Sequence, residues 1–384
     1  MNRSVCDVLI VGGGPAGLAA AIALKMRGAD VLVADALKPP IDKACGEGLM
    51  PDARRDLAAL GVGCEAGDGA WFDGIRFEHW TGRKRISASA VFPADKGFGM
   101  RRTVLHTRLL ERAAELGVRF RWETHVALGR SVTLNHELCT YRYLVGADGQ
   151  SSQVRKWADL DRGRLISRRF GFRSHYRLTP FSSFVEVHWS ALGQVYITPV
   201  APDEICVATV TSRSDTRMQQ VIDSIPYLRE RFNRSEPSVR ERGSVTLTRR
   251  LKRVVKDNIA LIGDASGSVD AVTGEGLALS FRQAALLGRA IASNNLKDYA
   301  AGHGKILQMP QRMARALLLM DKHSALRNVG IRAFSGSPAL FRNVLDVHVG
   351  EETLPHFLMH HGMKMLRLMA SPRICAPDRE GVSL

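Results

Sequence analysis

The pattern of apolar residues at the start of the chain predicts a strand, a helix and a second strand. Residues 5–11 and 29–34 are short, mostly apolar runs of the kind that forms buried strands. The intervening segment 15–27 is expected to be helical, because Pro15 suits a first helical turn and small apolar residues follow it. Together the three segments form a predicted βαβ unit.

Later segments continue the alternation of strands and helices. The predicted elements are a helix over 103–116, a strand near 143–147, and a strand over 258–263 that leads into a helix near 275–293. We assign these elements to the same domain as the βαβ unit.

Two further segments show a different pattern, in which apolar and polar residues alternate. The alternation covers 74–87 and about 167–250, and it predicts a mostly antiparallel sheet inserted into the first domain. After residue 297 the pattern becomes helical, with apolar side chains recurring on one face. These side chains are Met309, Met313, Leu317 and Met320.

The predicted fold class is therefore α/β. It combines a Rossmann-type dinucleotide-binding domain, an inserted, mostly antiparallel β-sheet domain for the substrate, and a C-terminal helical region. The expected ranges are 1–73, 98–165 and 251–297 for the discontinuous first domain, 74–97 and 166–250 for the inserted domain, and 298–384 for the helical region.

Composition narrows the class of partner. The 384 residues are 45% hydrophobic and 24% charged, as in globular proteins. Lysines and arginines number 54 against 38 acidic residues, so the formal charge of +16 favours anionic partners such as nucleotides, anionic lipid or an acidic carrier protein. The arginines are spread along the chain without a nucleic-acid motif, so no nucleic-acid partner is expected.

Cysteine spacing and hydropathy bear on location. The six cysteines form no C-x-x-C pair and no metal-ligand spacing, which indicates reduced thiols in a cytoplasmic protein. No stretch approaches the about 18 to 20 continuous apolar residues of a transmembrane segment, so any membrane association is expected to be peripheral. The cysteines are Cys6, Cys45, Cys64, Cys139, Cys206 and Cys375.

A glycine motif follows the first predicted strand directly. Residues 12–17 read Gly-Gly-Gly-Pro-Ala-Gly, a G-x-G-x-x-G sequence between strand and helix. Gly12 permits the tight turn, Gly14 lets the backbone approach a pyrophosphate, and Gly17 allows the helix and strand to pack closely. Asp35 ends the second strand, where it would accept hydrogen bonds from a ribose.

Two more strands end in an aspartate beside a glycine. Asp148 follows the strand near 143–147 and precedes Gly149, and Asp264 follows Gly263 after the strand 258–263. In a doubly wound sheet such strand ends converge on the ligand crevice, where a carboxylate can bind ribose or ribityl hydroxyls. Either dipeptide in isolation is also typical of a plain turn.

In this order, the motifs resemble those of the class A flavin monooxygenase superfamily, to which para-hydroxybenzoate hydroxylase and the geranylgeranyl reductases belong. The resemblance spans residues 5 to about 290 and includes Val154-Arg155 and Thr273-Gly274-Glu275-Gly276. It implies a non-covalently bound FAD and transient binding of NADPH or NADH. It places FAD at Gly12, Gly14, Ala16, Gly17, Asp35, Arg102, Asp148, Gly149, Gly263, Asp264, Gly274 and Gly276.

Departures from the hydroxylase pattern concern the reaction. The hydroxylases usually have a proline shortly after the Gly-Asp motif, whereas this chain has Val-Asp-Ala-Val-Thr at 269–273. The segments 43–48 and 273–276 are closer to the geranylgeranyl reductase branch. The Trp-x-Trp-x-Ile-Pro signature of flavin halogenases is absent, so halogenation is set aside.

Three other features carry candidate chemistry. Cys45 lies in a glycine-rich loop that the resemblance places near the flavin; its thiol could donate a proton or be a small buried hydrophobe. Glu47 beside it is expected to face solvent. The pair His360-His361 lacks a further ligand at convincing spacing, so no metal site is expected.

The segment 353–370 is rich in methionine and leucine, with Lys364 and Arg367 among them. It could lie on an anionic membrane or accept a lipidic substrate. We favour a C-terminal helix that packs its methionine-rich face on the substrate domain.

The favoured function is an NAD(P)H-dependent monooxygenase that hydroxylates an apolar or aromatic small molecule, such as a polyketide or lipid, free or carrier-bound. The alternative is a reductase that delivers hydride to a carbon-carbon double bond of a prenyl or polyketide chain, with Cys45 as a candidate proton source. Three cofactor motifs argue against a non-catalytic binding protein. A plain NAD-dependent dehydrogenase would leave Asp148 and Asp264 without a function.

Overall fold

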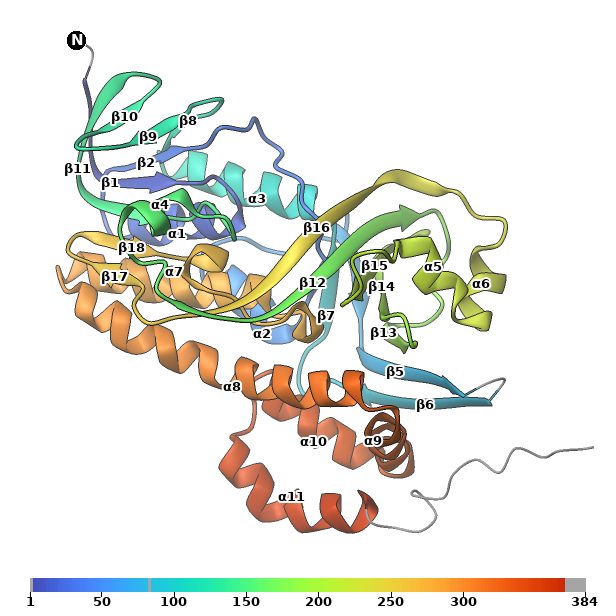
Figure 1. Cartoon of the computed structure of the whole chain (residues 1–384). Helices are drawn as coiled ribbons and strands as arrows, with labels where there is room; N and C mark the ends of the chain where they lie inside the picture. The colour runs from blue at the N-terminus through green and yellow to red at the C-terminus, as the bar shows by residue number, and fades with distance from the viewer. Residues whose placement is uncertain (1–2, 82–83, 370–384) are drawn as a thin grey trace, which may run out of the picture.

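The computed structural model describes residues 3–81 and 84–369. Cys375, and Ala370 at the end of the methionine-rich segment, lie outside these ranges. Its first sheet has the strand order β17-β18-β11-β1-β2-β8 (Figure 1). The five strands from β18 to β8 run parallel, and β17 is antiparallel to β18. Their bounds are β1 Arg3–Val11, β2 Val31–Ala34, β8 Arg119–Arg121, β11 Glu137–Gly146, β17 Val255–Lys256 and β18 Ile259–Leu261.

Three helices pack against one face of this sheet: α1 (Pro15–Lys25), α3 (Arg102–Glu115) and α7 (Gly276–Ala292). Small side chains let α1 lie close to its neighbours, and nearly all of its residues are buried. The opposite face packs against α4 (Gln153–Trp157) and the hairpin of β9 (Val126–Leu128) and β10 (Val132–Leu134). Because both faces are covered, β2, β18 and the carboxyl-terminal parts of β1 and β11 are apolar and buried.

The second sheet has seven strands in the order β16-β12-β15-β14-β13-β5-β6. All neighbours are antiparallel except β13 and β5, which run parallel. The long strands β12 and β16 extend from beside the first sheet to the far end of the second (Figure 1). The bounds are β5 Gly74–Thr81, β6 Lys84–Val91, β12 Gly163–Tyr176, β13 Phe184–Trp189, β14 Gln194–Ala201, β15 Glu204–Thr211 and β16 Pro237–Leu251.

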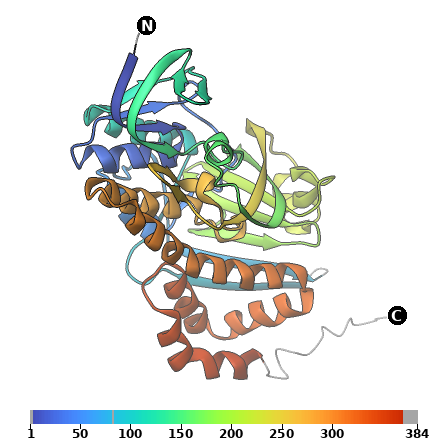
Figure 2. The same cartoon turned by 60° about the vertical axis from the view of Figure 1, so that its left-hand side comes forward.

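Four helices follow α7 in the described part of the chain. They are α8 (Leu296–Lys322), α9 (Ser324–Gly336), α10 (Pro338–His348) and α11 (Leu354–Met369). Helix α8 starts beside α7, α9 and α10 pack against β6, and α11 packs against α9 and α10 (Figure 1 and Figure 2). Phe77 of β5 contacts Phe334 of α9 and Phe341 of α10, so aromatic packing joins these helices to the sheet.

Smaller elements connect these layers. They are β3 (Gly48–Leu49), α2 (Pro51–Ala58), β4 (Gly69–Phe72), β7 (Gly97–Met100), α5 (Met218–Asp223), α6 (Pro226–Phe232), and the 3-10 turns η1 (Gly263–Ser266) and η2 (Ala271–Thr273). The α/β fold class predicted from the pattern is confirmed. The strand expected near 143–147 is the end of the longer β11, because its earlier residues pair with β1 and β10.

Candidate functional site

The carboxyl ends of β1, β2, β11 and β18 meet at a cavity of about 1020 Å³ that continues between the second sheet and the C-terminal helices. Every predicted site residue lines this cavity except Gly17. The lining members of that set are Gly12, Gly14, Ala16, Asp35, Cys45, Arg102, Asp148, Gly149, Gly263, Asp264, Gly274 and Gly276. Folding thus brings together residues as distant in the sequence as Gly12 and Gly276, which are 264 positions apart.

The glycine motif forms the turn between β1 and α1. Gly12 has a φ of +110°, and a Cβ there would overlap the backbone of Ala147. Gly17 packs against the carbonyl of Gly12, which leaves no room for a side chain and explains its absence from the cavity. Gly14 differs, because a Cβ added there would meet no protein atom within 4 Å. At Gly14, therefore, the backbone is open to a ligand.

The carboxylate of Asp35 holds this turn in place. Its Oδ2 accepts a hydrogen bond of 2.7 Å from the backbone N–H of Gly13, and its Oδ1 accepts one of 2.8 Å from Leu37. Asp264, in the turn η1 that follows β18, forms an ion pair of 3.2 Å with Lys43. Lys43 belongs to the glycine-rich loop that includes Cys45, so this contact joins two of the predicted motifs.

Asp148 caps the start of α4 and also has one carboxylate atom free. Its Oδ2 accepts hydrogen bonds from the backbone N–H groups of Gln153 and Val154, at 2.7 and 3.1 Å. Its Oδ1 is buried without a protein partner. A buried polar atom of this kind is costly unless a ligand or water satisfies it.

Arg102 begins α3 and lines the same cavity. Its Nε is likewise buried and has no hydrogen-bond acceptor in the protein. Since a guanidinium group is always charged, this orphaned donor is suited to an anionic ligand. The backbone N–H of Arg102 donates to Glu47 Oε1 over 3.0 Å.

The expectation that Glu47 faces solvent was wrong, because its side chain is 2% exposed. Its Oε2 lies 2.6 Å from His175 Nε2, and the guanidinium of Arg173 approaches its Oε1 at 3.7 Å. Glu47 also has a φ of +59°, an unusual backbone conformation for a side chain of this size. The carboxylate therefore anchors the Cys45 loop to the second sheet.

Glu47, His175 and Cys206 place ligand-type atoms within 4.8 Å of one another. Burial raises the pKa of the Cys206 thiol well above its ordinary value, which opposes the thiolate that a metal ion needs. His175 Nε2 is already paired with Glu47, and Arg173 supplies positive charge beside them. We assign this cluster a structural role.

Glu275 is a functional candidate that the sequence motifs did not single out. It precedes the first residue of α7, lines the cavity and is 2% exposed, and its Oε2 has no hydrogen-bond partner. His348 Nδ1 lies 3.8 Å from that oxygen, too far for a hydrogen bond. Burial raises the pKa of Glu275, which favours the neutral acid.

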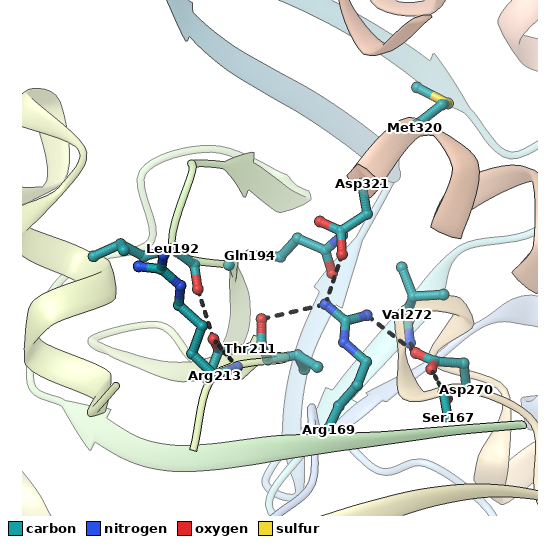
Figure 3. A network of polar contacts seen from close by, with 12 residues as sticks. Ser167, Arg169, Leu192, Gln194, Thr211, Arg213, Asp270, Val272, Met320 and Asp321 are labelled. Carbon is teal, nitrogen blue, oxygen red and sulfur yellow. Dashed lines mark hydrogen bonds and ion pairs between the residues drawn. The ribbon is translucent and has the colours of Figure 1, made fainter. Parts of the chain in front are cut away.

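A buried network holds the loop between η1 and α7. Asp270 accepts hydrogen bonds from Arg169 and Ser167 (Figure 3). It also accepts one from Thr248. Arg169 also pairs with Asp321 near the end of α8 at 3.1 Å. Asp270 is one of the residues that replace the usual proline here, so the departure noted in the sequence supplies the anchor of this loop.

The remainder of the cavity is lined mainly by apolar side chains. They come from the second sheet and from the C-terminal helices, and include Phe77, Val187, Trp189, Leu317, Phe334, Phe341 and Phe357. The lining also includes Leu319 of α8 and Leu358 of α11, which are 51% and 49% exposed. Leu319 and Leu358 therefore belong both to the cavity lining and to the partly exposed surface of the protein.

This arrangement is that of a dinucleotide-binding fold with an attached apolar compartment. The family described as "FAD binding domain" matches residues 5–302, and the chain belongs to this family of FAD-dependent oxidoreductases. The family and fold expected from the motifs are thereby confirmed.

Curated relatives and solved structures agree with this assignment. The chain is 27% identical to menaquinone reductase of Mycobacterium tuberculosis, over 86% of this chain and 90% of the relative. It is 26% identical to digeranylgeranylglycerophospholipid reductase 1 of Methanothermobacter thermautotrophicus, over 75% and 77%.

Among solved structures, a flavoprotein/dehydrogenase from Cytophaga hutchinsonii has a TM-score of 0.79 at 18% identity, covering 95% of this chain and 98% of that one. PqsL, a probable FAD-dependent monooxygenase from Pseudomonas aeruginosa, has a TM-score of 0.70 at 22% identity, covering 87% and 99%. These likenesses show the fold. Within 3–81 and 84–369, none of the helices is both long and apolar enough to cross a membrane.

Proposed function

We propose that this protein reduces carbon-carbon double bonds in a long prenyl-type chain, with FAD as cofactor and NADPH or NADH as reductant. The observation that carries this proposal is the single cavity that runs from the strand ends, past Glu275, to the exposed edges of α8 and α11. A compartment of this length and apolarity suits an extended hydrocarbon chain. Two relatives are named as reductases, of menaquinone and of digeranylgeranylglycerophospholipid, which supports a reductase acting on a lipid.

The residues present fit FAD. We propose that Gly12, Gly14, Ala16 and the start of α1 hold its pyrophosphate, since a helix N-terminus at a glycine turn favours phosphate. Arg102 would pair its orphaned Nε with the same group. Asp35 would accept hydrogen bonds from the adenosine ribose, and Gly17 would keep α1 close to β1.

The ribityl and flavin ends have their own set of residues. Asp264 with Gly263, and Asp148 with Gly149, are proposed for the hydroxyl groups of the cofactor, and Gly274 and Gly276 for the turn beside the flavin ring. Bound FAD supplies the hydride-transfer chemistry that amino-acid side chains lack. Reduction of a double bond also requires a proton for the second carbon, which an acidic side chain at the cavity wall can supply.

We propose Glu275 as that proton donor. As the hydride adds to one carbon of the double bond, the Oε2 proton of Glu275 would pass to the other carbon and leave a carboxylate. His348, 3.8 Å away, is placed to restore the proton. Cys45 is the second candidate; its Sγ lies 3.4 Å from the backbone N–H of Glu47 at the cavity wall.

Hydroxylation remains the second candidate function, because the aromatic cluster of Phe77, Phe334 and Phe341 could also hold an aromatic ring. One experiment separates the two reactions. The purified flavoprotein is given NADPH and a geranylgeranyl lipid without oxygen, and the product is analysed by mass spectrometry. We expect a gain of two hydrogen atoms per reduced bond.

The result in air provides the contrast. A product that has gained an oxygen atom, formed only in air and with matching oxygen consumption, would overturn the reductase proposal in favour of hydroxylation. No product from polyprenyl lipids in either condition would also count against it.

A further inference from the structure

Helix α11 presents two apolar faces, and within residues 3–81 and 84–369 the protein covers one of them. Phe357, Met365 and Leu368 pack against residues of α8, α9 and α10. On the other side of the helix, Met359, Met363 and Leu366 are spaced by four and three residues, so they form one stripe. Their exposed fractions are 76%, 63% and 57%.

This exposed stripe corrects the expectation that the methionine-rich face packs on the substrate domain. Met365 does face inward, but Met359 and Met363 point to solvent. Exposing several adjacent large apolar side chains is costly in water, and a surface of this kind usually contacts a partner. Leu358, which is also partly exposed, lies on the adjacent side of α11.

Basic residues border the stripe. Lys364 and Arg367 of α11 are exposed, as are His356 and His360. The nearest acidic groups are already paired, since Glu351 contacts Arg55 and Glu352 lies 2.7 Å from His356. An apolar stripe flanked by cationic side chains matches the boundary between the headgroups and acyl chains of an anionic bilayer.

One residue next to the stripe in the sequence also lines the cavity. Leu358 belongs both to the exposed surface and to the cavity lining, as does Leu319 of α8. These partly exposed lining residues offer a hydrocarbon chain in a bilayer an apolar route into the cavity. This continuity favours a lipid surface over an acidic protein as the occupant.

We propose that α11 docks this protein on the surface of an anionic phospholipid bilayer, with Met359, Met363 and Leu366 inserted below the headgroups, and that substrate enters the cavity past Leu358 and Leu319. The proposal goes beyond the reaction assigned above and holds whichever chemistry the flavin performs. The docked helix lies along the surface and does not cross the bilayer.

Sedimentation with vesicles tests this docking on the full-length flavoprotein. We expect binding to phosphatidylcholine vesicles that contain phosphatidylglycerol, and binding roughly tenfold or more weaker to phosphatidylcholine alone, given about 1 kcal/mol for each of Lys364 and Arg367. The variant Met359→Ser/Met363→Ser should bind the anionic vesicles at least about tenfold more weakly. Its bound flavin and its activity on a short, water-soluble prenyl substrate should match the wild type, because neither residue lines the cavity.

The matched control is Leu165→Ser/Ile166→Ser, which removes two apolar side chains of 50% and 52% exposure from β12. This variant should bind vesicles as the wild type does. An equal loss in the control, no wild-type binding to anionic vesicles, or equal binding to both vesicle types would overturn the proposal. So would a wild-type dimer that Met359→Ser/Met363→Ser converts to a monomer with no change in vesicle binding, because the stripe would then be a contact between copies.

Discussion

The Oε2 atom of Glu275 lies 3.8 Å from Nδ1 of His348, at the point where the start of α7 meets the end of α10. Both side chains line the cavity, and within the described ranges Oε2 makes no hydrogen bond. The contact joins the start of α7, which packs on the first sheet, to α10 of the C-terminal helices. A buried carboxyl group whose pKa is raised by burial is thereby held at the junction of the two compartments.

Replacing this acid should remove the proton-transfer step while preserving the shape of the site. We expect Glu275→Gln to lower kcat for double-bond reduction by about 100-fold or more, since general acids contribute on this scale. Flavin content should be unchanged. Cys45→Ala, measured alongside, should lower kcat by less than about tenfold; the reverse order of the two effects would assign the proton to Cys45.

The pH dependence of the reaction has a defined sign. Burial raises the pKa of Glu275 above its ordinary value of 4.5, so the acid stays protonated to a higher pH than a solvated glutamate. As a proton donor it is active below that raised pKa, and kcat should fall as pH increases through it. Glu275→Gln should abolish this descending limb, and a limb that persists in the variant would belong to another group.

Two glycines of the first turn should respond differently to the same substitution. Gly14→Val adds a side chain where no protein atom lies within 4 Å, so the protein should fold but lose FAD affinity by at least about tenfold. Gly17→Val forces a side chain into the carbonyl of Gly12 and should destabilise the fold by about 3 kcal/mol or more. Flavin absorbance and chemical denaturation distinguish the two results; full flavin occupancy in Gly14→Val would contradict the assignment.

The ionic network in Figure 3 should carry substantial stability. Arg169→Met leaves Asp270 buried and unpaired, and we expect a loss of about 3 to 5 kcal/mol in the free energy of unfolding. Arg162→Met is the control, because its side chain is 71% exposed and pairs only locally with Asp159; its loss should stay below about 1 kcal/mol. If urea denaturation showed equal losses of unfolding free energy for the two variants, the predicted stabilising role of the buried network would be wrong.

His303 should make the protein sensitive to acid. Burial lowers its pKa to about 4, and its Nε2 lies 2.9 Å from Ser266 Oγ at the turn after β18. The unfolded chain takes up a proton near pH 6.5 and the folded protein does not, so stability falls as pH decreases from about 6.5 to about 4.

The expected loss from His303 is about 3 kcal/mol over that range. His79 contributes in the same direction, since its pKa is also lowered to about 4, chiefly by burial. The difference in pH-dependent stability between the wild type and His303→Gln therefore measures the contribution of His303 alone. The variant should lose less stability on acidification, and identical pH profiles would contradict the role of His303.

The amino-acid sequence by itself determined the family, the α/β fold class and the positions of the cofactor motifs. It could do so because a glycine turn, a strand end and a helix start are local features, set by nearby residues and short-range geometry. Gly12, Asp148 and Asp264 lie within three residues of the ends of β1, β11 and β18, and parallel strands bring such ends to one edge of a sheet.

Only the tertiary structure decided which polar side chains are buried and which apolar ones are not. Glu47 is buried by His175, 128 positions away along the chain, and Glu275 by the distant α10 that carries His348. Met359 and Met365 look equivalent in the sequence, yet one faces solvent and the other packs inward. Burial depends on what the rest of the chain places against a residue, and no local pattern contains that information.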